Sequence, residues 1–135
     1  MTESTGKAER EKMYTDFLRT EGYLPELEMD EQVVFKKGNQ FYVIVVTEDA
    51  DYFQILVPGF WPIENEAERV QARVAAHAAN AETKVAKIYF YEDDTWASVQ
   101  LFCIPPESFK PVFGRCISVL EHAVETFVKQ MRGGG

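Results

Sequence analysis

The sequence predicts a single α+β domain, in which helices pack on an antiparallel sheet in the order α-β-β-β-α-β-β-α. Three observations favour this class. Apolar residues follow helical spacing in three stretches, β-rich runs occupy the stretches between them, and short polar turns join neighbouring runs. A chain of 135 residues also has the length of one domain. We expect residues 1–6 and 133–135 to be loose.

The first helix is expected over residues 7–21. Its apolar residues recur at four-residue steps that begin at Met13 and Tyr14, and charged residues fill many of the other positions. Gly22 follows directly, and glycine is the residue most often found just past a helix end. This amphipathic helix should cover one face of the sheet.

Three strands are expected after this helix. The first covers residues 27–35 and is interrupted by two acidic residues. The second, over residues 41–47, is apolar on both faces and therefore belongs in the centre of the sheet. The third returns over residues 52–57. Because the intervening turns are short, these strands form an antiparallel meander.

A corner is expected at residues 56–63, where two prolines bracket a glycine, Phe60 and Trp61. Proline cannot donate to a strand ladder, so strand pairing must stop here and the chain must change layers. The two aromatic side chains therefore lie at an irregular position of the backbone. Either they fill the core at this corner or they line a groove.

The second helix begins near residues 64–66, whose acidic side chains suit the positive end of a helix. A stripe of small apolar residues follows at three- and four-residue steps. The stripe comprises Ala67, Val70, Val74, Ala78 and Ala81. We expect it to lie flat on the sheet, and a subunit contact through its first four members is the alternative.

A second hairpin is expected from residues 84–91 and 95–104, joined by an acidic turn at 92–94. Apolar and more polar residues alternate along both strands, as in strands with one partly wet face. Pro105 and Pro106 end this hairpin and start the last helix. The stripe of that helix is the longest in the chain. It comprises Phe109, Phe113, Cys116, Leu120, Val124, Phe127 and Met131.

The charge balance limits the expected partners. The chain carries 22 acidic and 14 basic residues, for a net charge of -8. This field repels phosphate backbones and anionic lipid, so neither nucleic acid nor a membrane surface is an expected partner. With no signal peptide and no apolar run of membrane-spanning length, we expect a cytoplasmic protein. Cys103 and Cys116 are then expected as reduced, buried thiols, with a disulfide between them as the alternative.

Motifs of catalytic chemistry are lacking in the sequence. It has neither a glycine-rich phosphate loop nor a nucleophile elbow, and His77 and His122 are expected on helix surfaces. The acidic clusters at 48–51 and 92–94 lack the ligand spacing of a calcium loop and are better explained as hairpin turns. We therefore expect no enzyme activity, no cofactor and no metal.

Three runs of the sequence resemble the YbjN-like domain family: FQILVPGFWPI at 53–63, VAKIY at 85–89 and WASVQLF at 96–102. The resemblance extends from about residue 27 to residue 128. It implies the architecture of CesT-like type III secretion chaperones, which are small, acidic and usually dimeric proteins that hold an extended segment of a client. It further implies a homodimer with a chaperone-like or regulatory role, since some members are labelled sensory-transduction regulators. It carries over no catalytic residues.

The favoured function is a non-catalytic module that binds an extended peptide in an apolar groove or along a sheet edge. The residues expected to bind it are aromatic, and for each a place in the core is the alternative. They are Phe60, Trp61, Tyr42, Phe53, Tyr89 and Tyr91. Two other functions remain open: a structural subunit that assembles through the second helix, and a ligand sensor or small enzyme that uses a carboxylate pocket. Such a pocket would join at least two of Asp49, Asp51, Glu92 and Asp94.

Overall fold

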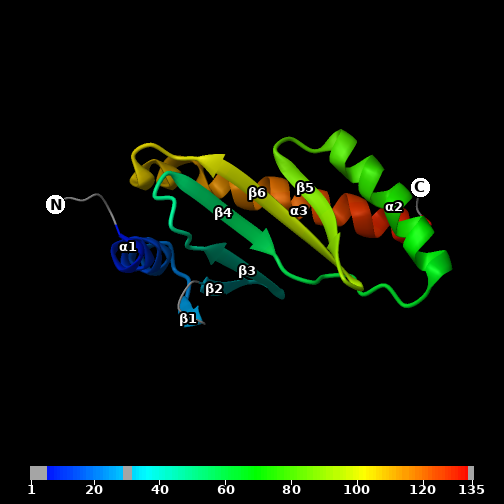
Figure 1. Cartoon of the computed structure of the whole chain (residues 1–135), viewed down its shortest axis with the longest axis horizontal. Coiled ribbons are helices and arrows are strands. Elements are labelled where there is room, and N and C mark those ends of the chain that lie inside the picture. Colours follow the sequence, from blue (N-terminus) through cyan, green and yellow to red (C-terminus); the bar gives the residue numbers. More distant parts are fainter. Residues whose placement is uncertain (1–5, 29–31, 134–135) are drawn as a thin grey trace. The chain divides into compact units, whose positions relative to one another are not determined.

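The computed structural model describes residues 6–28 and 32–133. In this part of the chain, six strands form an antiparallel sheet in the order β1-β2-β3-β4-β6-β5, with α-helices packed on it (Figure 1). The predicted α+β class is therefore confirmed, with one strand more than predicted. Along the chain the elements are α1 (Lys7–Thr20), β1 (Glu26–Glu28), β2 (Gln32–Lys37), β3 (Gln40–Val45), β4 (Tyr52–Val57), α2 (Glu66–Glu82), β5 (Ala86–Tyr91), β6 (Asp94–Phe102), the 3-10 helix η1 (Pro106–Val112) and α3 (Phe113–Met131).

The predicted first strand is in fact two strands. β1 pairs antiparallel with β2, so the expectation of one strand over residues 27–35 is wrong. β1 has only three residues, all exposed, and it lacks the apolar alternation that would separate it from a loop. Residues 29–31 of this stretch lie outside the described residues. So do residues 1–5 and 134–135, on which most of the expectation of loose ends falls.

The chain divides into two compact units, each assembled from segments that are distant in sequence. Unit 1 contains Met1–Leu56 and Gln100–Phe113, and unit 2 contains Val57–Val99 and Gly114–Gly135. Unit 1 therefore holds α1, the strands β1 to β3, most of β4, the end of β6 and η1. Unit 2 holds the corner, α2, β5, most of β6 and nearly all of α3.

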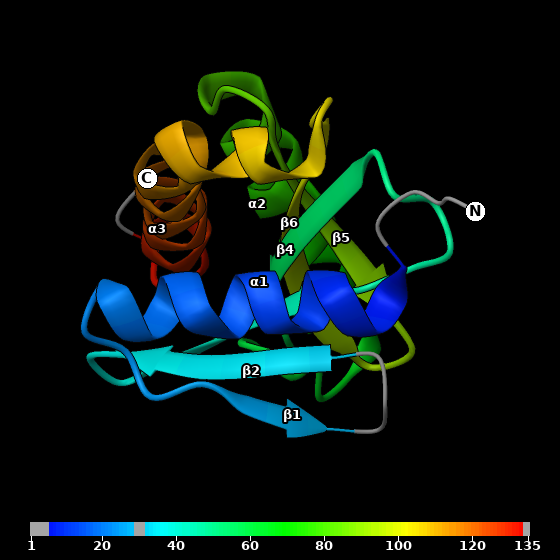
Figure 2. The same ribbon diagram turned by 90° about the vertical axis from the view of Figure 1, so that its left-hand side faces the viewer.

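In unit 1, α1 runs alongside β2 and contacts η1 (Figure 2). It buries Tyr14 and Leu18, as its sequence periodicity predicts. Arg10 of the same helix is also buried, and its Nη2 donates a hydrogen bond to the backbone oxygen of Thr47 at 2.8 Å. A buried guanidinium needs such acceptors, because it has lost its hydration.

An aromatic cluster forms the core of unit 1. The ring centroid of Phe109, from η1, lies 4.9 Å from that of Tyr14 and 5.3 Å from that of Phe53. Ring pairs at such separations contribute stability beyond their buried area. Burial within this cluster raises the pKa of Tyr14 to about 12. The aromatic cluster comprises Tyr14, Phe17, Tyr23, Phe35, Tyr42, Phe53, Phe109 and Phe113.

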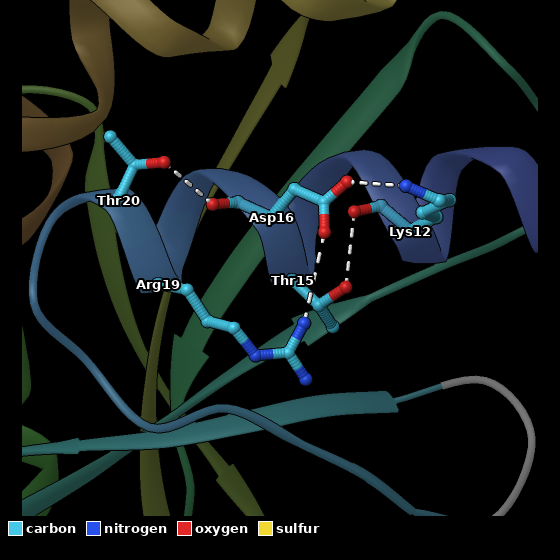
Figure 3. A network of polar contacts seen from close by, with 5 residues as sticks. All are labelled: Lys12, Thr15, Asp16, Arg19 and Thr20. Carbon is cyan, nitrogen blue, oxygen red and sulfur yellow. Dashed lines mark hydrogen bonds and ion pairs between the residues drawn. The ribbon is translucent and has the colours of Figure 1, made fainter.

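Polar side chains of α1 form a network within the helix, in which Thr15 is buried and the others are exposed (Figure 3). Lys12 Nζ lies 2.7 Å from Asp16 Oδ2, and Arg19 Nη1 lies 3.7 Å from Asp16 Oδ1. The hydrogen bond from Lys12 holds the pKa of Asp16 below its usual value. The hydroxyls of Thr15 and Thr20 donate to backbone oxygens three and four residues earlier. All these contacts lie within one helix, so they support α1 and do not build a binding site.

In unit 2, α2 runs beside β5 (Figure 1). Asn65 caps this helix, because its side chain accepts a hydrogen bond from the backbone N–H of Glu68 at 2.8 Å. The expectation that the stripe of Ala67, Val70, Val74, Ala78 and Ala81 lies flat on the sheet is wrong, since its two valines are 52% and 63% exposed. Alanines occupy two rows of this helix, and spacing does not distinguish the buried row. The buried row is Ala72, Ala75, Ala76 and Ala79.

The last elements follow the predictions more closely. β5 and β6 form the expected hairpin, with Ile88 opposite Ala97. A 3-10 helix precedes α3, where one continuous helix is expected, and Pro111 lies inside it without an N–H to donate. The predicted stripe of the last helix is buried, except for the half-buried Val124. Cys103 and Cys116 are buried and form no disulfide, and burial raises the pKa of the Cys103 thiol.

Candidate functional site

Two of the residues expected to bind a peptide are core residues. Tyr42 and Phe53 are each 1% exposed and belong to the aromatic cluster. Tyr42 stacks on Phe35, with ring centroids 5.4 Å apart. Each strand also buries a residue on its opposite face, Val43 in β3 and Leu56 in β4, so both strands are covered on two sides. The assignment of these two side chains to a peptide site is therefore corrected, because no ligand reaches them in this structure.

The aromatic residues of the corner are half-buried and pack inward. Phe60 and Trp61 both meet the buried ring of Phe127 edge-on, with ring centroids 5.5 Å and 6.1 Å from it. Gly59 permits the chain to turn here, since its φ is 30° and a Cβ would lie 2.6 Å from Asp94 Oδ2. Of the two alternatives for this corner, filling the core is the one that its geometry supports.

Hydrogen bonds hold the corner on both sides. Glu68 of α2 accepts from Trp61 Nε1 at 3.1 Å and from the backbone N–H of Glu64 at 2.8 Å. Thr95 of β6 accepts from the Phe60 N–H at 2.9 Å, and its hydroxyl donates to the Trp61 oxygen at 2.8 Å. The polar groups of Trp61 are thus already engaged, which leaves only part of its ring for a ligand.

The tip of the β5–β6 hairpin presents aromatic rings to solvent. Tyr91 is 60% exposed, and its ring meets that of Trp96 edge-on at 6.2 Å. Trp96 is half-buried and lies opposite Tyr89 on the same face of the hairpin. These three residues are called the aromatic face. A hollow of about 320 Å³ opens beside it. The residues that line the hollow are Tyr91, Glu92, Asp93, Asp94 and Trp96.

The carboxylates of the hollow differ in how far they are already engaged. Asp93 pairs with Arg69 of α2, and Asp94 Oδ1 accepts the N–H of Thr95 at 2.9 Å. Glu92 is exposed at the turn, where its φ is 55°. Three carboxylates against one guanidinium leave the hollow negatively charged, which favours a cationic or polar-donor ligand group.

Two of the four carboxylates of the alternative hypothesis, Glu92 and Asp94, line one hollow, as that hypothesis requires. Asp49 and Asp51 belong to unit 1, and the Asp51 N–H donates to Asp49 Oδ1 at 3.0 Å. Such a bond is typical of an Asx turn and explains these residues by local structure. Among the residues that the structure describes, no group of three or more His, Cys, Asp or Glu side chains is arranged to hold a metal ion.

The outer edge of β5 is partly closed by a side chain. Asn80 of α2 accepts a hydrogen bond from the Ile88 N–H at 2.7 Å and donates one to the Ile88 oxygen at 3.1 Å. One amide side chain therefore satisfies both backbone groups of a strand residue. At the opposite edge of the sheet, β1 is short and bears the exposed Glu26 and Glu28. Neither edge is a long, unblocked template for another strand.

Two other surfaces of unit 2 are apolar. The outward stripe of α2 exposes Val70 and Val74, and Ala67 is exposed beside them, with Ala78 half-buried. A hollow of about 400 Å³ lies along α3 between apolar and charged side chains. Its lining residues are Val124, Glu125, Val128, Lys129 and Arg132. Neither surface carries an aromatic ring.

Sequence reasoning missed two residues of this region. Trp96 was not among the expected binding residues, although its alternation with Ala97 and its pairing with Tyr89 place it on the aromatic face. Its indole Nε1 is buried and has no hydrogen-bond partner among the described residues. Asn80 carried no sequence signal, because its role depends on a contact between a helix and a strand edge.

Comparison of the chain with protein families, curated proteins and solved structures finds no match. No helix within residues 6–28 and 32–133 is both long and apolar enough to cross a bilayer. His77 and His122 are exposed on α2 and α3, as expected. The geometry of the hairpin tip is therefore the main basis for a functional proposal.

Proposed function

We propose that the protein is a non-catalytic module that holds an extended segment of another protein against the aromatic face of the β5–β6 hairpin. The observation that carries this proposal is the hollow at the hairpin tip, where Tyr91 and Trp96 stand beside three carboxylates. Exposed aromatic rings are costly to leave in water and are enriched where proteins bind partners. Binding at this place would use side chains more than the sheet edges, since Asn80 occupies the β5 edge at Ile88.

The segment that fits this surface is apolar or aromatic and carries at least one basic residue. A cation beside a tyrosine or tryptophan ring gains from the ring quadrupole, and the carboxylates of the hollow add Coulomb attraction. The net charge of -8 attracts basic segments at longer range. A chaperone-like or regulatory role, as the YbjN-like resemblance implies, is part of this proposal, and so is the cytoplasmic location expected from the sequence.

A structural subunit remains the second candidate. The specific observation in its favour is the outward stripe of α2, where Val70 and Val74 are exposed although they are apolar. A Val70→Lys/Val74→Lys double variant would disrupt assembly through this stripe and leave the aromatic face unchanged. Sedimentation of this variant and of the wild type over a range of concentrations separates an assembly role from a binding role.

The binding proposal is tested by selecting peptides from a displayed library of random 12-residue sequences against the wild-type protein. We expect the selected peptides to contain basic and aromatic residues. Tyr91→Ala should weaken their binding by about three- to tenfold, because it removes one cation–π or stacking contact and part of the hollow. Leu24→Ala is the matched control, since Leu24 is exposed and belongs to unit 1.

Two results would count against the proposal. One is a selection that yields no peptide above background for a folded protein. The other is a set of binding peptides that Tyr91→Ala and Leu24→Ala affect equally, because binding would then lie elsewhere on the surface.

A further inference from the structure

Asn80 bonds Ile88 in the way that a residue of a neighbouring strand would. In an antiparallel pair, alternate residues point both backbone groups toward one neighbour. Ile88 points its N–H and its oxygen toward α2, where the Asn80 amide supplies one acceptor and one donor. The same two hydrogen bonds are the ones that a residue of an added strand would make. Asn80 therefore occupies the place of a strand residue.

The contact sits where α2 is easiest to open. Asn80 lies in the last turn of the helix, which ends at Glu82. Helix ends fray at low cost, and opening this turn exposes only Ala79 of the buried alanine row, because Ala72, Ala75 and Ala76 lie in earlier turns. The last turn is held by Thr83, whose N–H and hydroxyl both donate to the Ala79 oxygen.

We infer that β5 is a strand-pairing surface, that Asn80 keeps it closed, and that its matching partner is β5 of a second copy of this chain. If two copies pair antiparallel about Ile88, the N–H and the oxygen of Ile88 in one copy bond to the oxygen and the N–H of Ile88 in the other. These two bonds replace the two that Asn80 makes with Ile88 within each copy. This inference does not depend on the proposed function, because it rests on the backbone edge of β5, and Tyr89 is the one residue of the aromatic face that enters its register.

The side chains of β5 suit this symmetric register. Ile88 would face Ile88 of the other copy, and Ala86 would face Phe90 on the same apolar side. On the other side Lys87 would face Tyr89, so that no two lysines lie opposite each other. Lys87 Nζ already lies 6.0 Å from the Tyr89 ring centroid within one chain, which indicates that these two side chains are compatible neighbours. β5 also contains no acidic residue, although the whole chain is acidic.

The test compares Asn80→Ala with Asn65→Ala by sedimentation over a range of concentrations. Both variants remove an asparagine that supports α2, but Asn65 only caps the start of the helix. We expect Asn80→Ala to lower the dissociation constant for self-association by at least about tenfold, since neither copy must then break two hydrogen bonds. Asn65→Ala should associate no more than the wild type.

The register is tested by cross-linking. Lys87→Cys and Tyr89→Cys, each combined with Asn80→Ala, are mixed and oxidised mildly. In the symmetric register these two positions form a non-hydrogen-bonded pair, with Cα atoms about 4.5 Å apart, which a disulfide can span. We expect the mixed disulfide to exceed either homodimer, and to be weak in an Asn65→Ala background.

The inference is overturned if Asn80→Ala associates no more than Asn65→Ala, or if it associates without the 87–89 disulfide. Should Asn80→Ala fail to fold, Asn80→Asp serves as the second variant, because it keeps an acceptor for the Ile88 N–H and loses the donor. We then expect Asn80→Asp to lower the dissociation constant for self-association relative to the wild type, by less than about tenfold. Wild-type behaviour of a folded Asn80→Asp would also contradict the inference.

Discussion

The two units of the molecule use their aromatic residues in different ways. In unit 1, rings from α1, three strands and η1 meet in one buried cluster, and Phe109 contacts several of them. In unit 2, the buried face of α2 is alanine and one phenylalanine, Phe127, anchors the corner. On its hairpin, Tyr91 is exposed, and Tyr89 and Trp96 beside it on the aromatic face are half-buried. Aromatic residues thus form the core of unit 1, whereas in unit 2 some of them form an accessible surface.

Whether an aromatic residue is buried or exposed therefore depends more on its neighbours than on its own type. Tyr42 and Phe53 lie in strands with buried residues on both sides, and their rings are sealed. Tyr91 and Trp96 alternate with residues of the opposite, buried face, such as Ala97. A strand with one buried face has its other face available for binding.

The largest expected effect is on the aromatic cluster. Phe109→Ala should lower the free energy of unfolding by about 3–5 kcal/mol, because it leaves a cavity where several rings meet. Phe102→Ala is the matched control, since Phe102 is 74% exposed in the same unit, and it should cost less than about 1 kcal/mol. Denaturant titration measures both. If both variants lose the same free energy of unfolding, the aromatic cluster is not the main source of stability in unit 1.

A second prediction uses the pKa of Tyr14, which burial raises to about 12. The folded state then holds this proton more tightly than the unfolded state, whose tyrosine titrates near 10. Stability is therefore intact below pH 10 and falls as the pH rises toward about 12, by roughly 2–3 kcal/mol. Tyr14→Phe should reduce this fall. If the two proteins lose stability in parallel over this range, Tyr14 is not sealed as described.

A smaller effect is expected at the corner of unit 2. Glu68→Ala removes the acceptor of Trp61 Nε1 and of the Glu64 N–H, and we expect a loss of about 1–2 kcal/mol in the free energy of unfolding. Glu66→Ala, at an exposed position of the same helix turn, should cost less. Trp61 fluorescence should also change in the first variant only. An unchanged stability would mean that the ring contacts with Phe127 hold the corner alone.

Much of the fold could be predicted from the sequence, because its strongest patterns are local. The four-residue steps of α1 and the long stripe of α3 each reflect the period of one helix. The errors lie where local patterns are weak. β1 is too short to show a period, and α2 has small apolar residues on two rows, so burial was assigned to the wrong row.

The candidate site could be predicted only in part. Tyr89 and Tyr91 were expected to bind, and they lie on the aromatic face, but binding itself is still a prediction. The hollow depends on how the acidic turn folds beside Trp96, and the closed edge depends on Asn80 reaching Ile88 from another element. Contacts between elements leave no periodic trace in the chain, so neither feature could be derived from the sequence.

The most direct test of the account is a nuclear magnetic resonance titration with a peptide selected against the wild-type protein. We expect the ring signals of Tyr89, Tyr91 and Trp96 to shift on binding, while those of Tyr42 and Phe53 stay in place. Shifts confined to Tyr42 and Phe53, with Tyr91 unchanged, would contradict it, because the sealed rings would then be the binding surface.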